Sequence, residues 1–373
     1  MKKTLIFIFM LIFIVFINNT LCCTIFMASK NGITLAGNNE DWVDPQTNVW
    51  FIPADKGMHG RVYFGFDVGL PQGGMNDQGL FFDCAATIPH MFTHPEQREE
   101  YKGNLMEKML EECATVEEAL KLFERYNLQH MFRFQILIAD KSGDAAIIEG
   151  DRVIRKEGDY QIATNFRQSL NEEQPYSIER YSTAESMLAK CNEVTVKLFR
   201  SILDATHQEP VQDSGSPTQY SNICNLNTGD IYLYHFHDYS NVVKFNLQKE
   251  LDRGEHSREI SSLFPRTTAY NNYKKKNQSK ERFPVAVEPS IFDRLIGEYE
   301  VIPQIHFTIT KENGKLFGRM RGFSRYELIP ESESTYFFKE LKARFTFIQN
   351  DNCFVDSLIF EMYGQEMLAR KIR

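Results

Sequence analysis

Short apolar segments alternate with turn residues through most of the chain, and this pattern predicts an α+β protein. The runs 24–29 and 33–36 are separated by Lys30-Asn31-Gly32, which predicts a β-hairpin because Asn-Gly favours the tight turn between antiparallel strands. Turns are also expected at 37–39, 71–74 and 76–78. Further strands are predicted at 62–68, 79–85, 134–140, 145–149, 161–164, 221–226, 230–235 and 241–247.

Apolar positions at helical spacing predict two helices within 104–126, with a break near Ala114-Thr115, and another helix from Tyr181 to about Asp204. Runs of strands packed against segregated helices are typical of a layered α+β domain. We expect this domain to span residues 23–267.

The final third of the chain has a different composition. A polar and basic stretch around Lys274-Lys275-Lys276 predicts a linker at 268–288. Residues 289–373 then carry about six short strand-like runs separated by turn pairs such as Asn313-Gly314, which predicts a small antiparallel sheet or barrel. We expect an accessory domain without catalysis of its own.

The N-terminus predicts export. Lys2 and Lys3 precede an apolar run from Leu5 to Ile17, which is short for a membrane-spanning helix and typical of a signal peptide. Cleavage after Cys22 would remove residues 1–22 and expose Cys23 as a new N-terminus. An uncleaved anchor, or cleavage a few residues away, is equally compatible with this segment taken alone. After processing we expect an exported protein, periplasmic or secreted, without stable membrane insertion.

The charge and the cysteine content argue against nucleic-acid binding and against a metal site. Among 373 residues, 42 are Lys or Arg and 50 are Asp or Glu, and the net charge is -8. This balance argues against nucleic acid as a partner, because such proteins need a basic surface. The seven cysteines show no metal-type spacing, and most are expected to be buried thiols: Cys84, Cys113, Cys191, Cys224 and Cys353. His235, His237 and Asp238 lack an evident further ligand, so no metal and no cofactor are expected.

An N-terminal cysteine is a special nucleophile because its own α-amine can accept the thiol proton. The amine then needs a carboxylate and hydrogen-bond acceptors around it. Residues 37–42, Gly-Asn-Asn-Glu-Asp-Trp, offer such groups after the strand that pairs with the Cys23 strand, and hairpin register can bring Asp41 close to Cys23. Taken alone, these residues also fit a solvated polar turn.

Five motifs occur in order along the chain, and together they carry a family resemblance. They are Cys23-Thr24, Gly37 to Trp42, Gly74-Met75-Asn76-Asp77-Gln78-Gly79-Leu80, Ala163-Thr164-Asn165-Phe166 and Ser177-Ile178-Glu179-Arg180-Tyr181. The set resembles the choloylglycine hydrolase family of N-terminal-nucleophile cysteine amidases, which includes conjugated bile-salt hydrolases and penicillin V acylases. The resemblance covers residues 23–265 and implies an αββα sandwich of two stacked antiparallel sheets between helices.

The resemblance also implies roles for four residues. Cys23 would attack the amide carbonyl, with its α-amine as general base. Asp41 would hold that amine, Asn165 would orient it and stabilise the charged intermediate, and Arg180 would anchor the carboxylate network. For substrate binding we expect Asn38, Phe66, Phe82 and Asp83, although core packing is the default explanation for the phenylalanines.

This chain departs from the family pattern at two places. Many relatives have an arginine where Asn38 stands, and the run Phe81 to Ala86 lacks the asparagine that often supplies an oxyanion donor. A thiolate would be less favoured without that arginine. The segment Gly297-Glu298-Tyr299 also weakly resembles lipocalin-like β domains.

These observations predict an enzyme that hydrolyses a linear amide C–N bond in a small N-acyl amide through an acyl-thioester at Cys23. Cleavage by signal peptidase or self-cleavage would activate it. Two alternatives stay open: an inactive secreted protein that binds acyl amides, and an acyltransferase on the same scaffold. The oligomeric state is also open, a homo-oligomer included.

Overall fold

The computed structural model describes residues 23–66, 71–92, 98–170, 179–210, 216–277, 282–302, 305–320, 325–338, 343–350, 352, 354–362 and 365–373. The expected signal peptide, residues 1–22, and Cys353 lie outside these ranges. Among the helices in them, none combines the length and the apolar character needed to cross a bilayer.

Two antiparallel sheets are stacked face to face. The first consists of β1 (Thr24–Lys30), β2 (Ile33–Asp41), β10 (Tyr160–Ala163), β11 (Thr218–Asn225), β12 (Asp230–His235) and β13 (Asp238–Asn246). The second consists of β3 (Asn48–Ile52), β4 (Arg61–Gly65), β5 (Gly73–Asn76), β6 (Phe81–Ala86), β7 (Phe134–Ala139), β8 (Ala145–Ile148), β9 (Val153–Arg155) and β14 (His256–Glu259). Their orders are β10-β1-β2-β11-β12-β13 and β14-β3-β4-β5-β6-β7-β8-β9. Alternate residues of both sheets fill the core between them.

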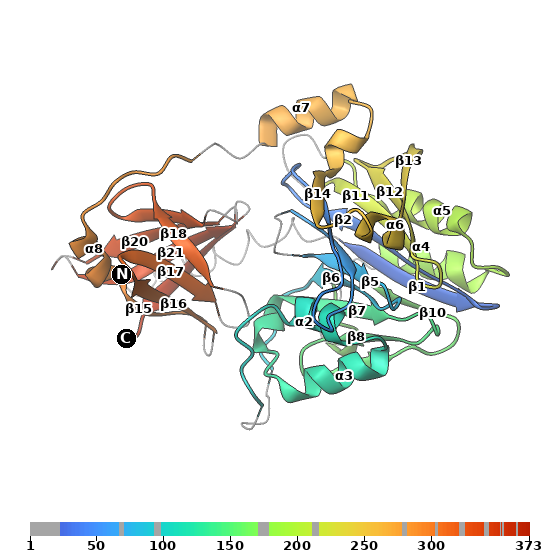
Figure 1. The fold of residues 1–373 in the computed structure, drawn as a ribbon, viewed down its shortest axis with the longest axis horizontal. Helices are drawn as coiled ribbons and strands as arrows, with labels where there is room; N and C mark the ends of the chain where they lie inside the picture. Colours follow the sequence, from blue (N-terminus) through green and yellow to red (C-terminus); the bar gives the residue numbers. More distant parts are fainter. Residues whose placement is uncertain are drawn as a thin grey trace, which may run out of the picture.

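Helices cover the outer faces of both sheets (Figure 1). A cluster around Phe26 and Phe199 joins the first sheet to α4 (Glu179–Ala189) and α5 (Val196–Thr206). A second cluster joins the other sheet to α2 (Leu105–Glu112) and α3 (Val116–Arg125). Shorter elements are η1 (Gln129–Arg133), η2 (Gln168–Leu170), α6 (Leu247–Leu251) and η3 (Ile260–Leu263). The predicted four-layer αββα sandwich is confirmed.

The predicted hairpin is present, but its second strand is longer than expected. Asn31 and Gly32 have φ of 53° and 78°, the left-handed conformation that this turn requires. β2 then continues to Asp41, so the turn expected at 37–39 is wrong. Asn39 pairs with Thr24 of β1 and with Ser221 of β11, and this pairing on both sides stabilises an extended conformation that polar residues do not favour by themselves.

Other differences also follow from pairing within the sheets. β5 lies on residues expected to form turns, and β9 was not predicted. At Gly73 a Cβ would lie 2.1 Å from Asp83 Oδ2, so glycine makes room for the carboxyl group of the neighbouring strand. The single helix expected from Tyr181 to Asp204 is divided into α4 and α5, and Thr195 caps α5 by accepting a hydrogen bond from Leu198 N.

The predicted linker is partly helical. α7 (Thr268–Asn277) occupies its first half and packs on the sandwich. The Tyr270 and Tyr273 hydroxyls donate to the carbonyl oxygens of Pro45 and Val43 at 3.0 and 2.8 Å. Lys274 pairs with Glu259 at 2.8 Å. These contacts order a stretch whose composition alone indicated a solvated connection.

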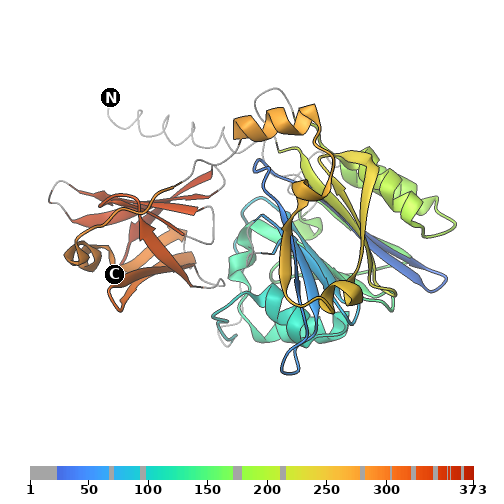
Figure 2. The same cartoon turned by 45° about the horizontal axis from the view of Figure 1, so that its top comes forward.

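The C-terminal residues form a closed barrel beside the sandwich (Figure 2). α8 (Pro289–Leu295) precedes its strands. These are β15 (Gly297–Ile302), β16 (Ile305–Glu312), β17 (Lys315–Met320), β18 (Tyr326–Pro330), β19 (Thr335–Phe338), β20 (Ala343–Gln349), β21 (Val355–Met362) and β22 (Gln365–Lys371). The expected small β domain is confirmed, with eight strands where about six were predicted. Ile305 is buried in the cluster beneath the second sheet, so barrel and sandwich share apolar contacts.

Candidate active site

Cys23 lies immediately before β1, at the end of the sandwich core. Its side chain is 5% exposed and belongs to the cluster between the sheets. Its backbone nitrogen donates to Asn165 Oδ1 at 2.8 Å. Cleavage before Cys23 would turn this same nitrogen into an α-amine. The predicted nucleophile and the predicted amine-orienting asparagine are therefore adjacent.

Arg180 connects the other two predicted catalytic residues. Its Nη2 donates to Asn165 Oδ1 at 3.0 Å, and its Nη1 donates to Asp41 Oδ2 at 3.1 Å. The Thr218 hydroxyl donates to the other Asp41 oxygen. Asp41 is fully buried at the end of β2, and Arg180 reaches it from the first turn of α4. The fold thus brings together Cys23, Asp41, Asn165 and Arg180 from four separate segments.

Asn165 presents its acceptor, not its donor, to this network. Its Nδ2 donates to the Ala86 carbonyl oxygen at 2.8 Å. Oδ1 accepts from both the Cys23 nitrogen and Arg180. If this nitrogen were an α-amine, a guanidinium that shares its acceptor would disfavour its protonation, because two like charges would lie close together. This arrangement suits a neutral amine that accepts a proton.

The thiol lies in an acidic environment. Burial raises the pKa of Cys23 well above its ordinary value, and the charges of Glu40, Asp41 and Asp83 raise it further. The thiol is therefore protonated near neutral pH, and it could act as a nucleophile only if a base accepted its proton.

Glu40 is the residue nearest to the thiol that sequence reasoning left without a role. Cys23 Sγ lies 3.7 Å from Glu40 Oε1, and Asn38 Nδ2 donates to Glu40 Oε2 at 3.1 Å. Burial raises the pKa of Glu40 to about 8, although hydrogen bonds from Asn38, Cys23 and Tyr220 oppose the shift. Within the motif, this glutamate was indistinguishable from a solvent-exposed turn residue.

Asp83 faces Glu40 from the opposite sheet. It is fully buried on β6, between Phe81 and Ala85, which both belong to the cluster between the sheets. Burial raises its pKa well above the ordinary value, and the neighbouring Glu40 adds to the shift. Asp83 is one of the predicted substrate-binding residues, and its charge contributes to the raised pKa of Cys23.

Three predicted substrate-binding positions remain. Asn38 is buried on β2 and pairs in register with Asn222 of β11. The ring of Phe66 lies 5.8 Å from that of Trp42, just beyond β4. Phe82 packs with α2 and α3 on the outer face of the second sheet, so the expectation that it lines a pocket with Cys23 is wrong. Side chains alternate along a strand, which places Phe82 opposite to Asp83.

Thr218 and Asn222 were missed by sequence reasoning. Thr218 is buried and holds Asp41, while Asn222 lies one strand away from Asn38. The predicted strand 221–226 carries the polar residues Ser221, Asn222 and Asn225, and Thr218 lies just before it. Such residues point to a site only once their side chains are known to face the space between the sheets.

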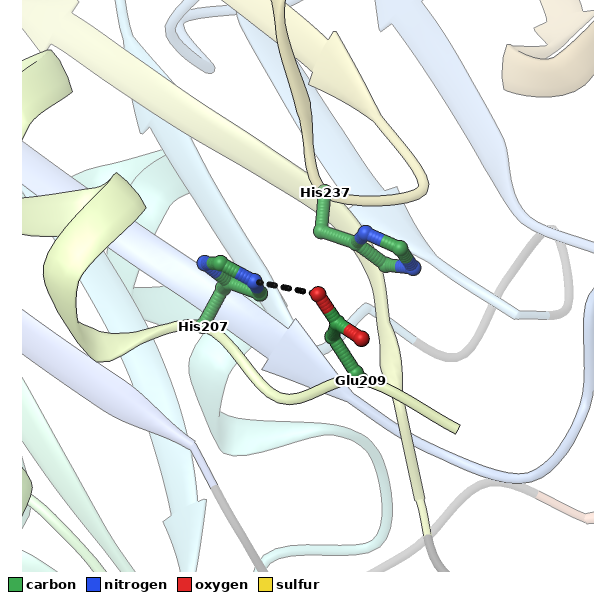
Figure 3. Close-up of side chains that lie close together, drawn as sticks. All are labelled: His207, Glu209 and His237. Atoms are coloured by element: carbon green, nitrogen blue, oxygen red, sulfur yellow. Dashed lines mark ion pairs between the residues drawn. The ribbon is translucent and has the colours of Figure 1, made fainter. Parts of the chain in front are cut away.

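A separate cluster consists of His207, Glu209 and His237 (Figure 3). His207 Nε2 lies 3.8 Å from Glu209 Oε1, and the two histidine rings stack with planes 8° apart. In-plane lone pairs of nearly parallel rings do not converge on one point, so this geometry is that of an ion pair and a ring stack. Burial lowers the pKa of His237. His235 is not part of this cluster.

Two comparisons relate this geometry to known proteins. The family model of acyl-coenzyme A:6-aminopenicillanic acid acyl-transferase matches residues 20–239. The chain belongs to this family. The matched residues of this acyl-transferase family member include Cys23, Asp41, Asn165 and Arg180, so the model covers the whole network.

Solved structures share the fold. An arginine-to-leucine variant of conjugated bile acid hydrolase from Clostridium perfringens has 15% identity and a TM-score of 0.50, over 64% of this chain and 97% of that one. A cysteine-to-alanine mutant of the same hydrolase has 16% identity and a TM-score of 0.50, over 70% and 99%. The family resemblance and the fold expected from the motifs are thus confirmed. No curated protein matches the chain significantly.

The elevated pKa of Glu40 predicts a pH dependence of stability. A carboxyl group with a pKa near 8 in the folded state, against an ordinary 4.5, binds more protons in the folded than in the unfolded state. The free energy of unfolding should therefore fall as the pH rises from about 4.5 to about 8. Denaturant unfolding at pH 5, 6.5 and 8 measures this slope. Glu40→Gln should flatten it, whereas the exposed Glu117→Gln should not; equal slopes would contradict the assignment.

Proposed function

We propose that the mature protein is an amidase that uses N-terminal Cys23 as its nucleophile and hydrolyses linear amide C–N bonds in small N-acyl amides. The observation that carries this proposal is the position of the Cys23 nitrogen. It donates to Asn165 Oδ1, which Arg180 links to buried Asp41. Such a network supports an α-amine as general base, because it holds that nitrogen beside the thiol.

The reaction would proceed in two stages. The neutral α-amine accepts the proton of the Cys23 thiol, and the thiolate attacks the carbonyl carbon. The resulting ammonium then returns this proton to the leaving nitrogen as the C–N bond breaks, which leaves an acyl-thioester and a free amine. In the second stage the α-amine deprotonates a water molecule, which attacks the thioester and releases the carboxylic acid and the thiol.

Arg180 and Asp41 would act by positioning. The buried ion pair at 3.1 Å keeps Arg180 in place, and Arg180 in turn orients Asn165 toward the amine. A charged pair with several hydrogen bonds holds a geometry that the side chains would not keep individually.

Acyl transfer is a second candidate because the matching family is described as an acyl-transferase. The same thioester would then be attacked by an amine in place of water. Adding a primary amine during turnover separates the two: a new amide indicates transfer, and free acid alone indicates hydrolysis. An inactive binding protein would retain its ligand without releasing any amine.

The substrate panel should sample linear amides with different acyl groups and leaving amines. It would include N-acyl amino acids, phenoxyacetyl amides and long-chain N-acyl amines. An acyl-enzyme mass on the N-terminal peptide after exposure to this mixture would identify the nucleophile and the acyl group together.

Maturation at Cys23 gives a first prediction. Export and removal of residues 1–22 should yield a protein whose N-terminal residue is Cys23. Only then does the Cys23 backbone nitrogen, which donates to Asn165, become an amine. Intact mass and N-terminal sequencing of the exported protein measure this. A mature chain that starts elsewhere would contradict the proposal, and the N-terminus of Cys23→Ala distinguishes self-cleavage from signal peptidase.

A further inference from the structure

Behind Cys23, buried polar side chains from both sheets lie close together in the space between the sheets. Asn38 Oδ1, Asn222 Nδ2 and Asp83 Oδ2 are buried and have no hydrogen-bond partner among the described residues. Asn38 also lies beside Asp83 and lowers its pKa, yet Oδ2 accepts no hydrogen bond of normal geometry. Buried polar atoms in a folded protein are nearly always paired. Their concentration beside a nucleophile points to a ligand.

The charge of this space is unbalanced. Glu40 and Asp83 are both fully buried carboxyl groups, and each is destabilised in its charged form by burial. In the described structure no lysine or arginine contributes to the pKa shift of either. Arg180 pairs with Asp41 instead. Two buried carboxyl groups without a cation are costly, so their presence at a reactive centre indicates a function.

We propose that Glu40, Asp83 and Asn38 bind the ammonium group of the substrate, and that the preferred substrates are amides of α-amino acids with a free amino group. The proposal rests on the proposed function and names its substrate class. A primary ammonium has three N–H donors. The acceptors available to it are Glu40 Oε1, Asp83 Oδ2 and Asn38 Oδ1, of which the last two are unpartnered among the described residues.

The place of Glu40 determines where the ammonium must lie. Glu40 Oε1 is 3.7 Å from Cys23 Sγ, and Sγ bonds to the carbonyl carbon of the substrate. A cation that pairs with Glu40 can therefore lie close to that carbon. An α-amino group on the acyl side satisfies this condition, whereas a charge at the far end of a long acyl chain does not.

A metal ion fits this space less well. In the described structure, the group of histidine, cysteine and carboxylate residues with ligand atoms within 4.8 Å of one another is His207, Glu209 and His237. Cys23, Glu40 and Asp83 do not form such a group. An organic cation with separate N–H donors can bridge acceptors that are too widely spaced for one metal ion.

Matched substrate pairs test the proposal. Alanyl, leucyl and phenylalanyl p-nitroanilides would be compared with propanoyl, 4-methylpentanoyl and 3-phenylpropanoyl p-nitroanilides, which lack only the amino group. We expect kcat/KM to be at least about 100-fold higher for the aminoacyl member, since a site built for N–H donors rejects the analogue that lacks them. Equal rates, or a preference for the uncharged member, would overturn the proposal.

This experiment distinguishes a failure of the ammonium site from a failure of the proposed amidase function. If the uncharged substrates acylate Cys23 and the aminoacyl substrates do not, the amidase function stands and the ammonium site is wrong. If neither series releases p-nitroaniline or adds an acyl mass to the N-terminal peptide, the proposed function itself fails for these acyl groups.

Replacing each carboxyl group with an amide tests whether Glu40 and Asp83 cause the preference for aminoacyl substrates. In Glu40→Gln and in Asp83→Asn we expect the ratio of kcat/KM between paired substrates to fall at least about tenfold, since each loses one charge opposite the ammonium. The exposed Glu117→Gln serves as the control and should keep the ratio. Because the readout is a ratio, a general loss of activity does not mimic the result. An unchanged ratio in both folded variants would contradict the proposal.

Discussion

Replacing Cys23 with alanine is expected to abolish amide hydrolysis in the mature protein while leaving the fold intact. Loss of a nucleophile that forms the covalent intermediate should lower kcat by at least about 10⁴-fold. The fold should persist because the substitution removes a single sulfur atom from a mostly apolar cluster. Amine release, circular dichroism and thermal unfolding measure the two effects separately.

Cys224→Ala is the matched control for this experiment. Cys224 is also a buried free thiol in the cluster between the sheets, and it lies further along β11 than the residues near Asp41. We expect it to keep hydrolysis and the acyl-enzyme mass at Cys23. A fully active Cys23→Ala enzyme would refute the proposed mechanism, and Cys23→Ser is less decisive because a hydroxyl can retain some activity.

Arg180→Met should be the second most damaging change. It leaves Asp41, which is fully buried, without its ion-pair partner, and it removes the donor that orients Asn165. Breaking such a pair costs up to about 3–5 kcal/mol, and less here because Arg180 itself is partly exposed. We expect kcat to fall at least about 100-fold through misplacement of the α-amine. Steady-state kinetics and denaturant unfolding provide the measurements.

The pH profile distinguishes positioning of the amine from general destabilisation. Without the guanidinium, the pKa of the α-amine should rise, so the acidic limb of the kcat profile should move to higher pH. Arg180→Lys should be intermediate, since one ammonium cannot match the two-pronged contact to Asp41 and Asn165. Arg200→Met on the neighbouring helix α5 is the control. A normal profile in Arg180→Met would show that the network has no catalytic role.

The sequence predicted the local structure correctly where residues close together in the chain determine the conformation. The Asn31-Gly32 turn has the positive φ values that its sequence favours. The break between α2 and α3 lies at the N-cap Thr115, as expected from the helical spacing around it. The family motifs likewise led to Cys23, Asp41, Asn165 and Arg180 because residue type and order are preserved in the sequence itself.

Where the predicted turns and linker were wrong, contacts with other strands and loops explain the observed structure. Residues 37–39 and 73–76 are polar or glycine-rich and resemble turns, yet each lies in a strand because neighbouring strands satisfy its backbone groups. The basic stretch containing Lys274 resembles a linker, yet tyrosine contacts to Pro45 and Val43 hold it as a helix on the sandwich. The β11 partners of 37–39 and the Pro45 and Val43 partners of α7 are distant in sequence, whereas β6 follows β5 closely.

The sequence by itself determined the fold class and the order of the motifs, and it pointed to Cys23 as the proposed nucleophile. The tertiary structure decided which polar residues face Cys23. Glu40 and Asp83 lie on different sheets, and a strand directs alternate side chains to opposite faces, so their meeting depends on the register and stacking of both sheets. The same alternation directs Phe82 to the outer face of the second sheet, away from Cys23. The acidic space beside the thiol, and with it the predicted substrate class, exists only in the packed sandwich.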